Sequence, residues 1–500
     1  MFESCHPFPF FDYFRVPYAV RPELAADHHG GGPFPVHGLR VADQPGQPGQ
    51  SGGGPSRSLL WPGAPATSRP AARPLGRYRL GDWTFFAPLA SGPEVSRALA
   101  RLGPGWRQAE QVLDDDGQPR AAVWRDDDGS VFLPFDPGEL MLQFWSEGYA
   151  RSGRPTLAAG GRTVLLRGYY LVRPALPRRL QLRMRQAYTR VQARSSFPGW
   201  PIEDSLHSFY SWLFRLLAEV AGQPVPYLAP WPDGRSWALV LTHDVETEAG
   251  CRDFGLLREP ERLLGYRSSW NFVPLRYPAP DSLMRELRQE GCEVGVHGLR
   301  HDGRDLASPR MLARRLPAIR EYARRWEATG FRSPATQRRW DMMPGLGFDY
   351  DSSYTDTDPY EPQPGGCCTY LPYFNRNLVE LPITLPQDHT MFAILRQTDA
   401  ELWLRKARLL RDRHGMVLAL THPDYARDQR LADGYRSLLD AFREDSTVWH
   451  ALPREVATWW RQRAASVPRR TDDGWQVDGP ASARARVLLA ATADTAGRAH

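Results

Sequence analysis

The chain has 500 residues, of which 42% are hydrophobic and 11% aromatic, so it is long enough for two or three domains with sizeable cores. No apolar run reaches the roughly 18–20 residues that a membrane span needs, and residues 1–20 lack the basic start and apolar core of a signal peptide. The formal net charge is +6, but the arginines are scattered among acidic residues, which argues against a nucleic-acid partner.

The cysteines point to a reducing compartment. There are five of them, and the adjacent pair Cys367 and Cys368 has poor geometry for an ordinary disulfide. The C-x-x-C spacing of a metal site is also missing. We therefore expect a reduced chain and a cytoplasmic location.

The two ends of the chain have the composition of disordered protein. Stretches such as QPGQPGQSGGGPS can bury little apolar surface, and we predict that residues 1–75 are largely disordered. Residues 466–500 are polar and rich in alanine, which predicts a flexible tail.

Residues 76–235 are predicted to form a smaller accessory α+β domain with a helical linker. The stretches YRLGDWTFFAPL and AAVWRDDDGSVFLPFD contain strand-type residues and Asp-Gly turn signals. The acidic triplets at 114–116 and 126–128 fit hairpin turns better than calcium loops, because neither has the spacing and the closing glutamate of the twelve-residue calcium loop. Helices are expected over 138–150 and 202–221.

Residues 236–465 alternate short apolar runs with helical patterns. This alternation predicts parallel strands joined by right-handed crossovers, in an α/β fold whose roughly seven strands curl into a distorted (β/α) barrel. The predicted strands are 237–243, 268–274, 292–298, 330–334, 377–383, 416–422 and 447–453, and the predicted helices are near 280–290, 308–328, 398–413, 430–443 and 453–464.

Residues able to do chemistry stand at the ends of these strands. Asp244 and Glu246 follow the first run, His297 and His301 end or follow the third, and His422 ends the sixth. Because the carboxyl ends of parallel strands lie on one face, we expect these side chains to meet at one rim.

Each pattern taken alone also fits a structural role. The spacing of His297 and His301 would place both on one face of a helical turn, where they could bind one ion, but two surface histidines have the same spacing. In extended chain, Asp244 and Glu246 point the same way, and a solvated acidic loop is the alternative. His422 could be a core histidine. His243, which points away from Asp244, is interpreted as structural.

Together these groups make a hydrolytic site. Two histidines and one carboxylate leave positions open on a zinc-type ion, which lowers the pKa of water and polarises a carbonyl group. A spare carboxylate can take a proton from the water, and a spare histidine can protonate a leaving amine. The set predicts hydrolysis of an amide or ester.

This part of the chain resembles the polysaccharide-deacetylase or NodB-homology family, also called carbohydrate esterase family 4. The resemblance covers about 230 residues. It is carried by T-H-D-V-E at 242–246, which is similar to the D-x-E form of the family's first motif, and by H-x-x-x-H at 297–301, R-x-P at 332–334, L-x-H at 420–422 and G-F-D-Y-D-S-S-Y at 347–354.

The resemblance implies a metal-dependent deacetylase that acts on an N-acetylated saccharide or glycoconjugate. The ion is expected to be zinc, with cobalt, nickel or manganese as alternatives. The implied roles are base for Asp244, metal ligands for Glu246, His297 and His301, a partner of the base for Arg332, oxyanion donor for the amide of Ala335, acid for His422 and support for Asp351. Asp388 and Asp424 are the two candidates for the acid that tunes His422.

Two other functions remain open. The same fold also serves non-sugar amide hydrolases resembling allantoinase, and the domain could be a catalytically weak saccharide-binding module. Substrate choice is expected to lie in residues 354–376 and 384–396. Their aromatic residues could stack on a sugar ring or pack the loops against the barrel, and these residues are Tyr360, Tyr370, Tyr373 and Phe374. The oligomeric state is not predicted.

Overall fold

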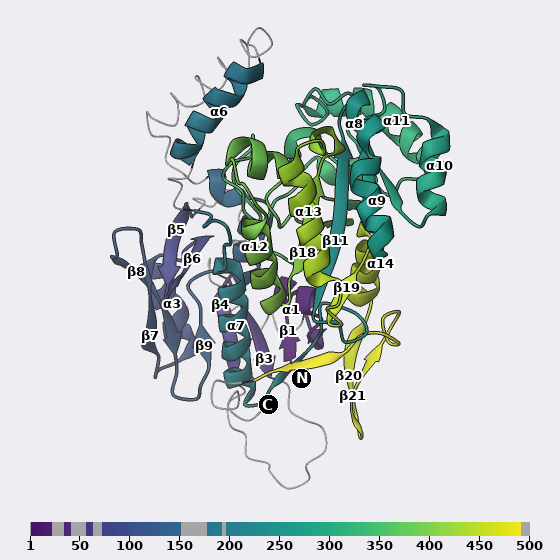
Figure 1. The fold of residues 1–500 in the computed structure, drawn as a ribbon. Helices are drawn as coiled ribbons and strands as arrows, with labels where there is room; N and C mark the ends of the chain where they lie inside the picture. Colours follow the sequence, from purple (N-terminus) through teal and green to yellow (C-terminus); the bar gives the residue numbers. More distant parts are fainter. Residues whose placement is uncertain are drawn as a thin grey trace. The chain divides into compact units, whose positions relative to one another are not determined.

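A computed structural model describes residues 2–22, 35–41, 57–63, 73–151, 178–192 and 197–491. The chain forms two compact units, each built from separate segments (Figure 1). Unit 1 contains Met1–Ser152, Asp204–Ala229 and Gln462–His500, and unit 2 contains Gly153–Glu203 and Pro230–Arg461. Within the described ranges, every helix is too short or too polar to cross a membrane.

Unit 1 is built on a nine-stranded sheet in the order β2-β1-β3-β4-β9-β8-β7-β5-β6. The strands are β1 (Phe2–Ser4), β2 (Tyr18–Val20), β3 (Val36–Val41), β4 (Ser58–Pro62), β5 (Leu75–Leu80), β6 (Trp83–Pro88), β7 (Arg107–Leu113), β8 (Pro119–Arg125) and β9 (Val131–Phe132). Its helices are α1 (Pro9–Phe14), α3 (Gly92–Leu102), α4 (Pro137–Trp145), the 3-10 turn η1 (Gly148–Arg151) and α7 (Ser205–Ala221).

The aromatic residues of unit 1 explain why it folds. Phe10 of α1 packs against Phe209 and Phe214 of α7, with ring centroids 6.5 and 4.8 Å apart. Both acidic triplets form turns as predicted, since the amides of Gly117 and Gly129 donate to the carbonyl groups of Asp114 and Asp126.

Both chain ends contradict the expectation of disorder. Four strands and one helix of unit 1 come from residues 2–62, and they hold the end of the chain through β-pairing and buried phenylalanines. After residue 466, β20 (Val467–Thr471) pairs with β21 (Gly474–Asp478), and β22 (Val487–Ala490) pairs with β10 (Val225–Leu228). The Gly- and Pro-rich stretches at 23–34, 42–56 and 64–72 lie outside the described residues.

Unit 2 contains the predicted parallel α/β region. Its sheet has the order β16-β17-β15-β14-β13-β12-β11-β18, with β19 also paired to β11. The strands are β11 (Trp237–Val245), β12 (Ser269–Phe272), β13 (Glu293–His297), β14 (Gly330–Arg332), β15 (Tyr350–Asp351), β16 (Tyr373–Asn375), β17 (Leu378–Glu380), β18 (Met416–Thr421) and β19 (Val448–His450).

All the predicted strands of this region are present. The pairs from β17 through β15, β14, β13, β12 and β11 to β18 are parallel, and only β16 is antiparallel to its neighbour. β15 and β16 were not predicted. Of the predicted distorted barrel of about seven strands, the structure shows a curled and mainly parallel sheet. Among the described residues β16 and β18 do not pair with each other, but the amides of Thr384 and Leu385, which follow β17, donate to the backbone oxygen of Leu418 in β18.

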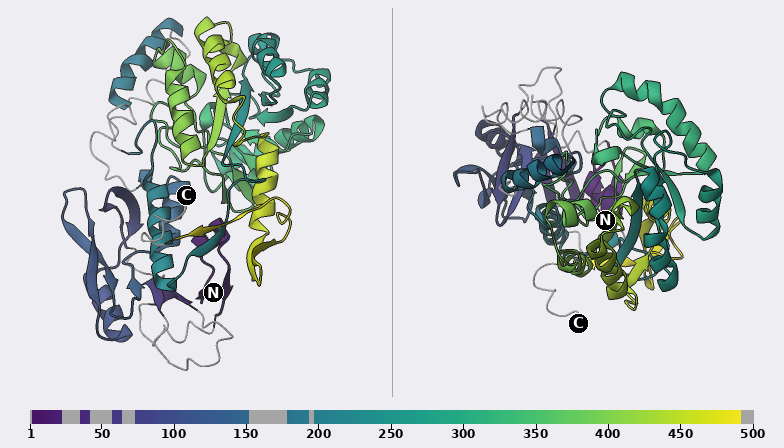
Figure 2. Two further views of the ribbon diagram at one scale, coloured as in Figure 1. Left: turned by 60° about the horizontal axis from the view of Figure 1, so that its bottom comes forward. Right: turned by 45° about the horizontal axis from the view of Figure 1, so that its top comes forward.

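Helices surround this sheet, as the two further views show (Figure 2). The helices of unit 2 are α6 (Arg178–Gln192), which contacts η5, and α8 (Glu248–Asp253), α9 (Gly255–Leu264), α10 (Asp281–Gln289), α11 (Pro309–Trp326), α12 (Glu401–Asp412), α13 (Gln429–Phe442) and α14 (Pro453–Ala464), with the short turns η3 (Pro334–Thr336), η4 (Met343–Leu346), η5 (His389–Ile394) and η6 (Pro423–Tyr425). Every residue of β11 is buried, which is typical of a parallel strand covered on both faces.

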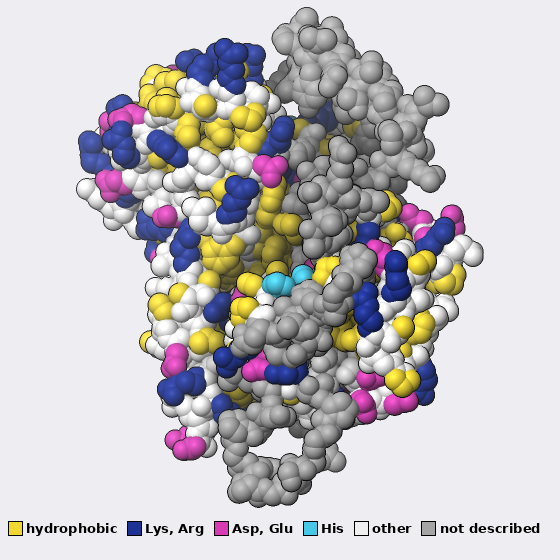
Figure 3. Space-filling model, turned by 180° about the vertical axis from the view of Figure 1, so that it is seen from behind, with side chains coloured by type: hydrophobic (Ala, Val, Ile, Leu, Met, Phe, Trp, Pro, Cys, Tyr) yellow, Lys and Arg dark blue, Asp and Glu magenta, His cyan; other side chains and the backbone are white. Residues whose placement is uncertain are grey.

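The surface charge is mixed. On the face seen in Figure 3, arginine and acidic side chains lie interspersed. Many are paired, for example Arg325 with Asp281 and Arg427 with Asp253.

Candidate active site

The candidate residues lie at the carboxyl ends of the strands of unit 2. Asp244 is the second-last residue of β11 and pairs with Asn271 of β12. His297 is the last residue of β13 and pairs with Arg332 of β14. His422 follows β18, which pairs with β11 on its other side. The parallel register therefore brings the carboxyl ends of these strands to one rim.

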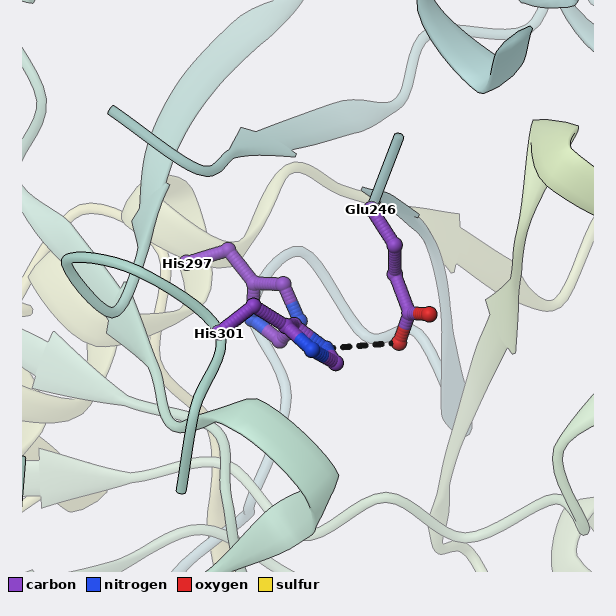
Figure 4. Close-up of side chains that lie close together, drawn as sticks. All are labelled: Glu246, His297 and His301. Atoms are coloured by element: carbon purple, nitrogen blue, oxygen red, sulfur yellow. Dashed lines mark hydrogen bonds and ion pairs between the residues drawn. The ribbon is translucent and has the colours of Figure 1, made fainter. Parts of the chain in front are cut away.

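Glu246, His297 and His301 form the possible metal centre. Their ligand atoms all lie within 4.8 Å of one another, and the close-up shows both imidazole rings turned toward the Glu246 carboxylate (Figure 4). Nε2 of His301 is 2.8 Å from Oε1 of Glu246. Two ligands of a tetrahedral zinc ion lie about 3.3 Å apart, given zinc–nitrogen distances of about 2.0–2.1 Å, so small side-chain movements would make room for an ion.

The hydrogen bonding of His297 fits a metal ligand. Its Nδ1 is 3.1 Å from the backbone oxygen of Arg332, so Nδ1–H donates and Nε2 carries the lone pair. That Nε2 is buried and has no hydrogen-bond partner among the described residues. Burial lowers the pKa of His297 to about 4, which keeps the ring neutral. A buried lone pair with an oriented ring is what a divalent cation requires, so these residues fit the implied metal.

The two histidines meet through a loop and not through a helical turn. His297 ends β13, and the backbone then turns through Gly298 (φ 62°) to His301 (φ 54°). A Cβ atom at Gly298 would lie 2.5 Å from Cγ of Pro334, so glycine is required for the close approach as well as for the positive φ. The ring centroids of His297 and His301 are 5.0 Å apart.

Asp244 is a buried carboxylate with several stabilising neighbours. Its Oδ1 accepts a hydrogen bond of 2.8 Å from Asn271, and it lies 3.5 Å from the Arg332 guanidinium. Its Oδ2 is 3.6 Å from Nε2 of His297. Burial alone would raise the pKa of Asp244, but the positive charges of Arg332 and His422 and the hydrogen bond from Asn271 outweigh it and lower the pKa. Asp244 is therefore ionised and able to accept a proton.

His422 is held by Asp388. Oδ1 of Asp388 is 2.6 Å from Nδ1 of His422, and Oδ2 accepts the backbone N–H of the same residue, also at 2.6 Å. Burial opposes the charged ring, but Asp388 outweighs it and raises the pKa of His422 to about 10. Asp424, the other candidate, accepts instead from the backbone N–H of Glu246 and from the Thr247 hydroxyl, so it positions the Glu246 segment.

Arg332 is fixed by two hydroxyl groups beside the base. It donates to Thr242 at 3.1 Å and to Ser352 at 2.8 Å. Asp351 acts one step further away, because it accepts from the amide and hydroxyl of Ser353, whose hydroxyl accepts the Ser333 amide at 2.9 Å. Burial raises the pKa of Asp351 to about 6.

Ala335 lies in a tight turn after Pro334. Both Ala335 (φ 54°, ψ 32°) and Thr336 (φ 50°) have left-handed backbone conformations. No described residue accepts a hydrogen bond from the Ala335 amide, in contrast to the amides of Thr336 and Gln337, which donate to Ser333 and Pro334. This amide is therefore free to donate to a ligand.

The predicted aromatic residues are packed inside the loops. Tyr360, Tyr370 and Tyr373 are buried, and Phe374 is half-buried. The Tyr373 ring stacks on Trp340 at 6.3 Å, and the Tyr360 ring meets Trp200 edge-on at 5.2 Å. In this arrangement, the three tyrosines hold the loops together.

Some residues of the site were not predicted. Asn271, Thr242 and Ser352 all touch Asp244 or Arg332. Thr242 stands two residues before Asp244 on the same strand, so strand alternation could have indicated it. Asn271 and Ser352 required knowledge of which strands are neighbours.

No protein-family model matches the chain, and no curated protein does. Solved structures similar to it include a putative polysaccharide deacetylase from Mycobacterium smegmatis (20% identity, TM-score 0.39, 47% of this chain and 93% of that chain). A probable polysaccharide deacetylase from Pseudomonas aeruginosa PAO1 (18%, 0.39, 49% and 97%) and the Puue allantoinase (17%, 0.39, 46% and 92%) are also similar.

Proposed function

We propose that unit 2 is a metal-dependent hydrolase that removes acetyl groups from an N-acetylated saccharide or glycoconjugate. One observation carries the proposal. A cluster of three potential ligands, with a buried and unpartnered imidazole nitrogen, lies between an ionised carboxylate and a protonated histidine. A binding module needs neither of these last two groups.

The ligand set is Glu246, His297 and His301. A divalent cation held there, zinc by preference, would supply Lewis acidity by polarising the acetyl carbonyl group and lowering the pKa of water. Asn271 donates to Oδ1 of Asp244 at 2.8 Å, and the Arg332 guanidinium lies 3.5 Å from the same oxygen, so the carboxylate keeps one orientation beside these ligands.

The chain's own groups provide the proton transfers. Asp244 takes the proton of the attacking water as a general base. His422, kept protonated by Asp388, gives a proton to the departing amine. The unpartnered amide of Ala335 is the proposed donor to the developing oxyanion.

The direct test is hydrolysis by the full-length protein after metal depletion and after addition of zinc, cobalt, nickel or manganese. The substrates are N-acetylglucosamine oligomers, N-acetylated glycolipid analogues and cyclic amides such as allantoin. Release of acetate only from the saccharides, restored by metal, would support the proposal. Turnover of cyclic amides alone would assign the site to the allantoinase type, and no turnover with any metal would overturn the hydrolase assignment.

A further inference from the structure

Two consecutive left-handed residues form the proposed oxyanion turn, and neither is glycine. Ala335 and Thr336 have φ values of 54° and 50°. Thr336 is β-branched, and β-branched residues almost never adopt this conformation unless their surroundings impose it. The surroundings of Thr336 therefore decide whether the Ala335 amide keeps its direction.

The surroundings of Thr336 come from the loop that follows β15. The Thr336 hydroxyl is 3.2 Å from Oε2 of Glu361 and 2.9 Å from the backbone oxygen of Ala335, and the side chains of Thr336 and Glu361 are buried. The other oxygen of Glu361 is 3.4 Å from the Thr390 hydroxyl on η5, directly after the residues that hold the proposed acid. Glu361 thus links the oxyanion turn to the segment of Asp388.

A second contact fixes the far side of the same turn. The Arg338 guanidinium donates to the backbone oxygen of Thr336 and to that of Gln363, both at 3.1 Å. The Gln363 side chain accepts the Arg338 amide at 3.1 Å. Glu361 and Gln363 belong to the same loop. Glu361 therefore contacts the side chain of Thr336, and Gln363 binds the arginine that contacts its backbone oxygen.

The helix α6 secures this loop from outside. Arg185 donates to the backbone oxygen of Tyr360 at 2.7 Å, and Gln192 donates to that of Pro359, also at 2.7 Å. Arg185 is also the positive charge that acts most strongly on Glu361. A segment far away in sequence thus holds the residue next to Glu361.

We propose that Glu361 is a positioning residue that holds Thr336 in its strained conformation and so keeps the Ala335 amide pointed at the developing oxyanion. The inference rests on the proposed hydrolase function. Because an oxyanion donor acts mainly in the transition state, losing its alignment lowers kcat and changes KM little.

The test compares variants of Glu361 and Thr336 in the full-length, zinc-loaded protein. Removing a whole oxyanion donor costs about a hundredfold or more in kcat, so misalignment in E361A and T336V should cost at least about tenfold. KM and zinc affinity should stay within about threefold of wild type. E361Q, whose amide oxygen can still accept from Thr336, should recover most of the loss.

Glycine at position 336 separates strain from the loss of a hydroxyl group. T336G and T336V both lack the hydroxyl, but glycine adopts a positive φ without strain. T336G should therefore have a kcat at least about fivefold above that of T336V. Equal rates in these two variants would overturn the proposal, as would an E361Q no better than E361A. T398V, at an exposed threonine bonded only to its neighbour Asp399, is the matched control.

A readout independent of turnover keeps this inference separate from the hydrolase proposal. Amide hydrogen exchange of the peptide over 333–337 should become at least about tenfold faster in E361A and T336V but not in E361Q. Unchanged exchange would overturn the role of Glu361 even in an active enzyme. Faster exchange in these variants of a protein without hydrolase activity would support the positioning role of Glu361. In that case only the proposed hydrolase function would be wrong.

Discussion

The sharpest prediction concerns stabilisation by metal. A ligand that binds only the folded state raises the free energy of unfolding by about 2.7 kcal/mol when its concentration is a hundred times its Kd. For a unit of roughly 280 residues, whose entropy of unfolding is about 2.1 cal/mol/K per residue, 1 kcal/mol shifts Tm by about 1.7 °C. Zinc at that concentration should therefore raise the Tm of unit 2 by about 4–5 °C.

The structure says which side chain this shift depends on. His297 supplies the buried Nε2 that has no hydrogen-bond partner among the described residues, and its ring is already oriented by Arg332. H297A should lose most of the zinc-dependent shift, because two ligands remain from a set of three. For each variant, the Tm without zinc is subtracted from the Tm with zinc. A loss of stability that the substitution causes in the apo-protein therefore does not affect the zinc-dependent shift.

The assay is differential scanning calorimetry, with titration calorimetry for the affinity. H414N is the control, since His414 is an exposed histidine far from the ligand set in the chain and asparagine tolerates its positive φ of 56°. It should keep the full shift. A wild-type protein that zinc, cobalt and nickel all fail to stabilise would refute the ligand assignment, as would an H297A variant with an undiminished shift.

The remaining predictions use single substitutions. D244N should lower kcat by about 10²–10⁴-fold while calorimetry shows zinc binding within threefold of wild type; an active D244N would remove Asp244 as the base. D388N should lower kcat by a similar factor, measured with the same substrate, because the charge that keeps the acid protonated is lost. Burial raises the pKa of Glu293 to about 7. The neutral form therefore contributes about 3 kcal/mol to the free energy of unfolding, fully below about pH 4.5. This contribution is lost as the pH rises through 7. The free energy of unfolding, measured in urea at pH 5 and pH 8, should differ less between the two pH values in E293Q than in the wild type. An equal difference in both proteins would contradict the raised pKa of Glu293. K406M should lower the free energy of unfolding, measured in urea, by about 3–5 kcal/mol. The reason is that Asp356 stays buried without the Lys406 ammonium group, which lies 2.8 Å away in the wild type. A decrease below about 1 kcal/mol would contradict this role.

The strands of unit 2 could be predicted because they are continuous apolar runs bounded by turn residues. β11 and β18 are examples, and both are wholly buried. β15 (Tyr-Asp) and β16 (Tyr-Phe-Asn) were missed because, unlike the other short strands, they are not part of a longer apolar run in the sequence. In the N-terminal region, the short strands β3 and β4 lie between Gly- and Pro-rich stretches whose composition dominates any window.

The details of the site depended on backbone conformations that sequence does not reveal. The spacing of His297 and His301 fits a helix, but a glycine and a left-handed histidine bring them together in a loop. Asp424 is two residues from His422 in the sequence, whereas Asp388 is 34 residues away, and only the packing of η5 against the end of β18 shows that Asp388 holds His422. The role of Glu361 required three-dimensional contacts, since it lies 25 residues from Thr336.

The charges of the site would favour a bound cation. Asp244, Glu246 and Asp388 are negative, whereas Arg332 and the protonated His422 are positive, and the His297 ring is neutral. In a buried region, this leaves an excess of negative charge among these groups, which disfavours the negative charge that develops on a carbonyl oxygen during hydrolysis. A divalent cation reverses the sign and favours that charge. Without a cation, the negative charge of Glu246 would repel the oxyanion. With a cation bound, Glu246 helps to hold the ion, and the ion attracts the oxyanion.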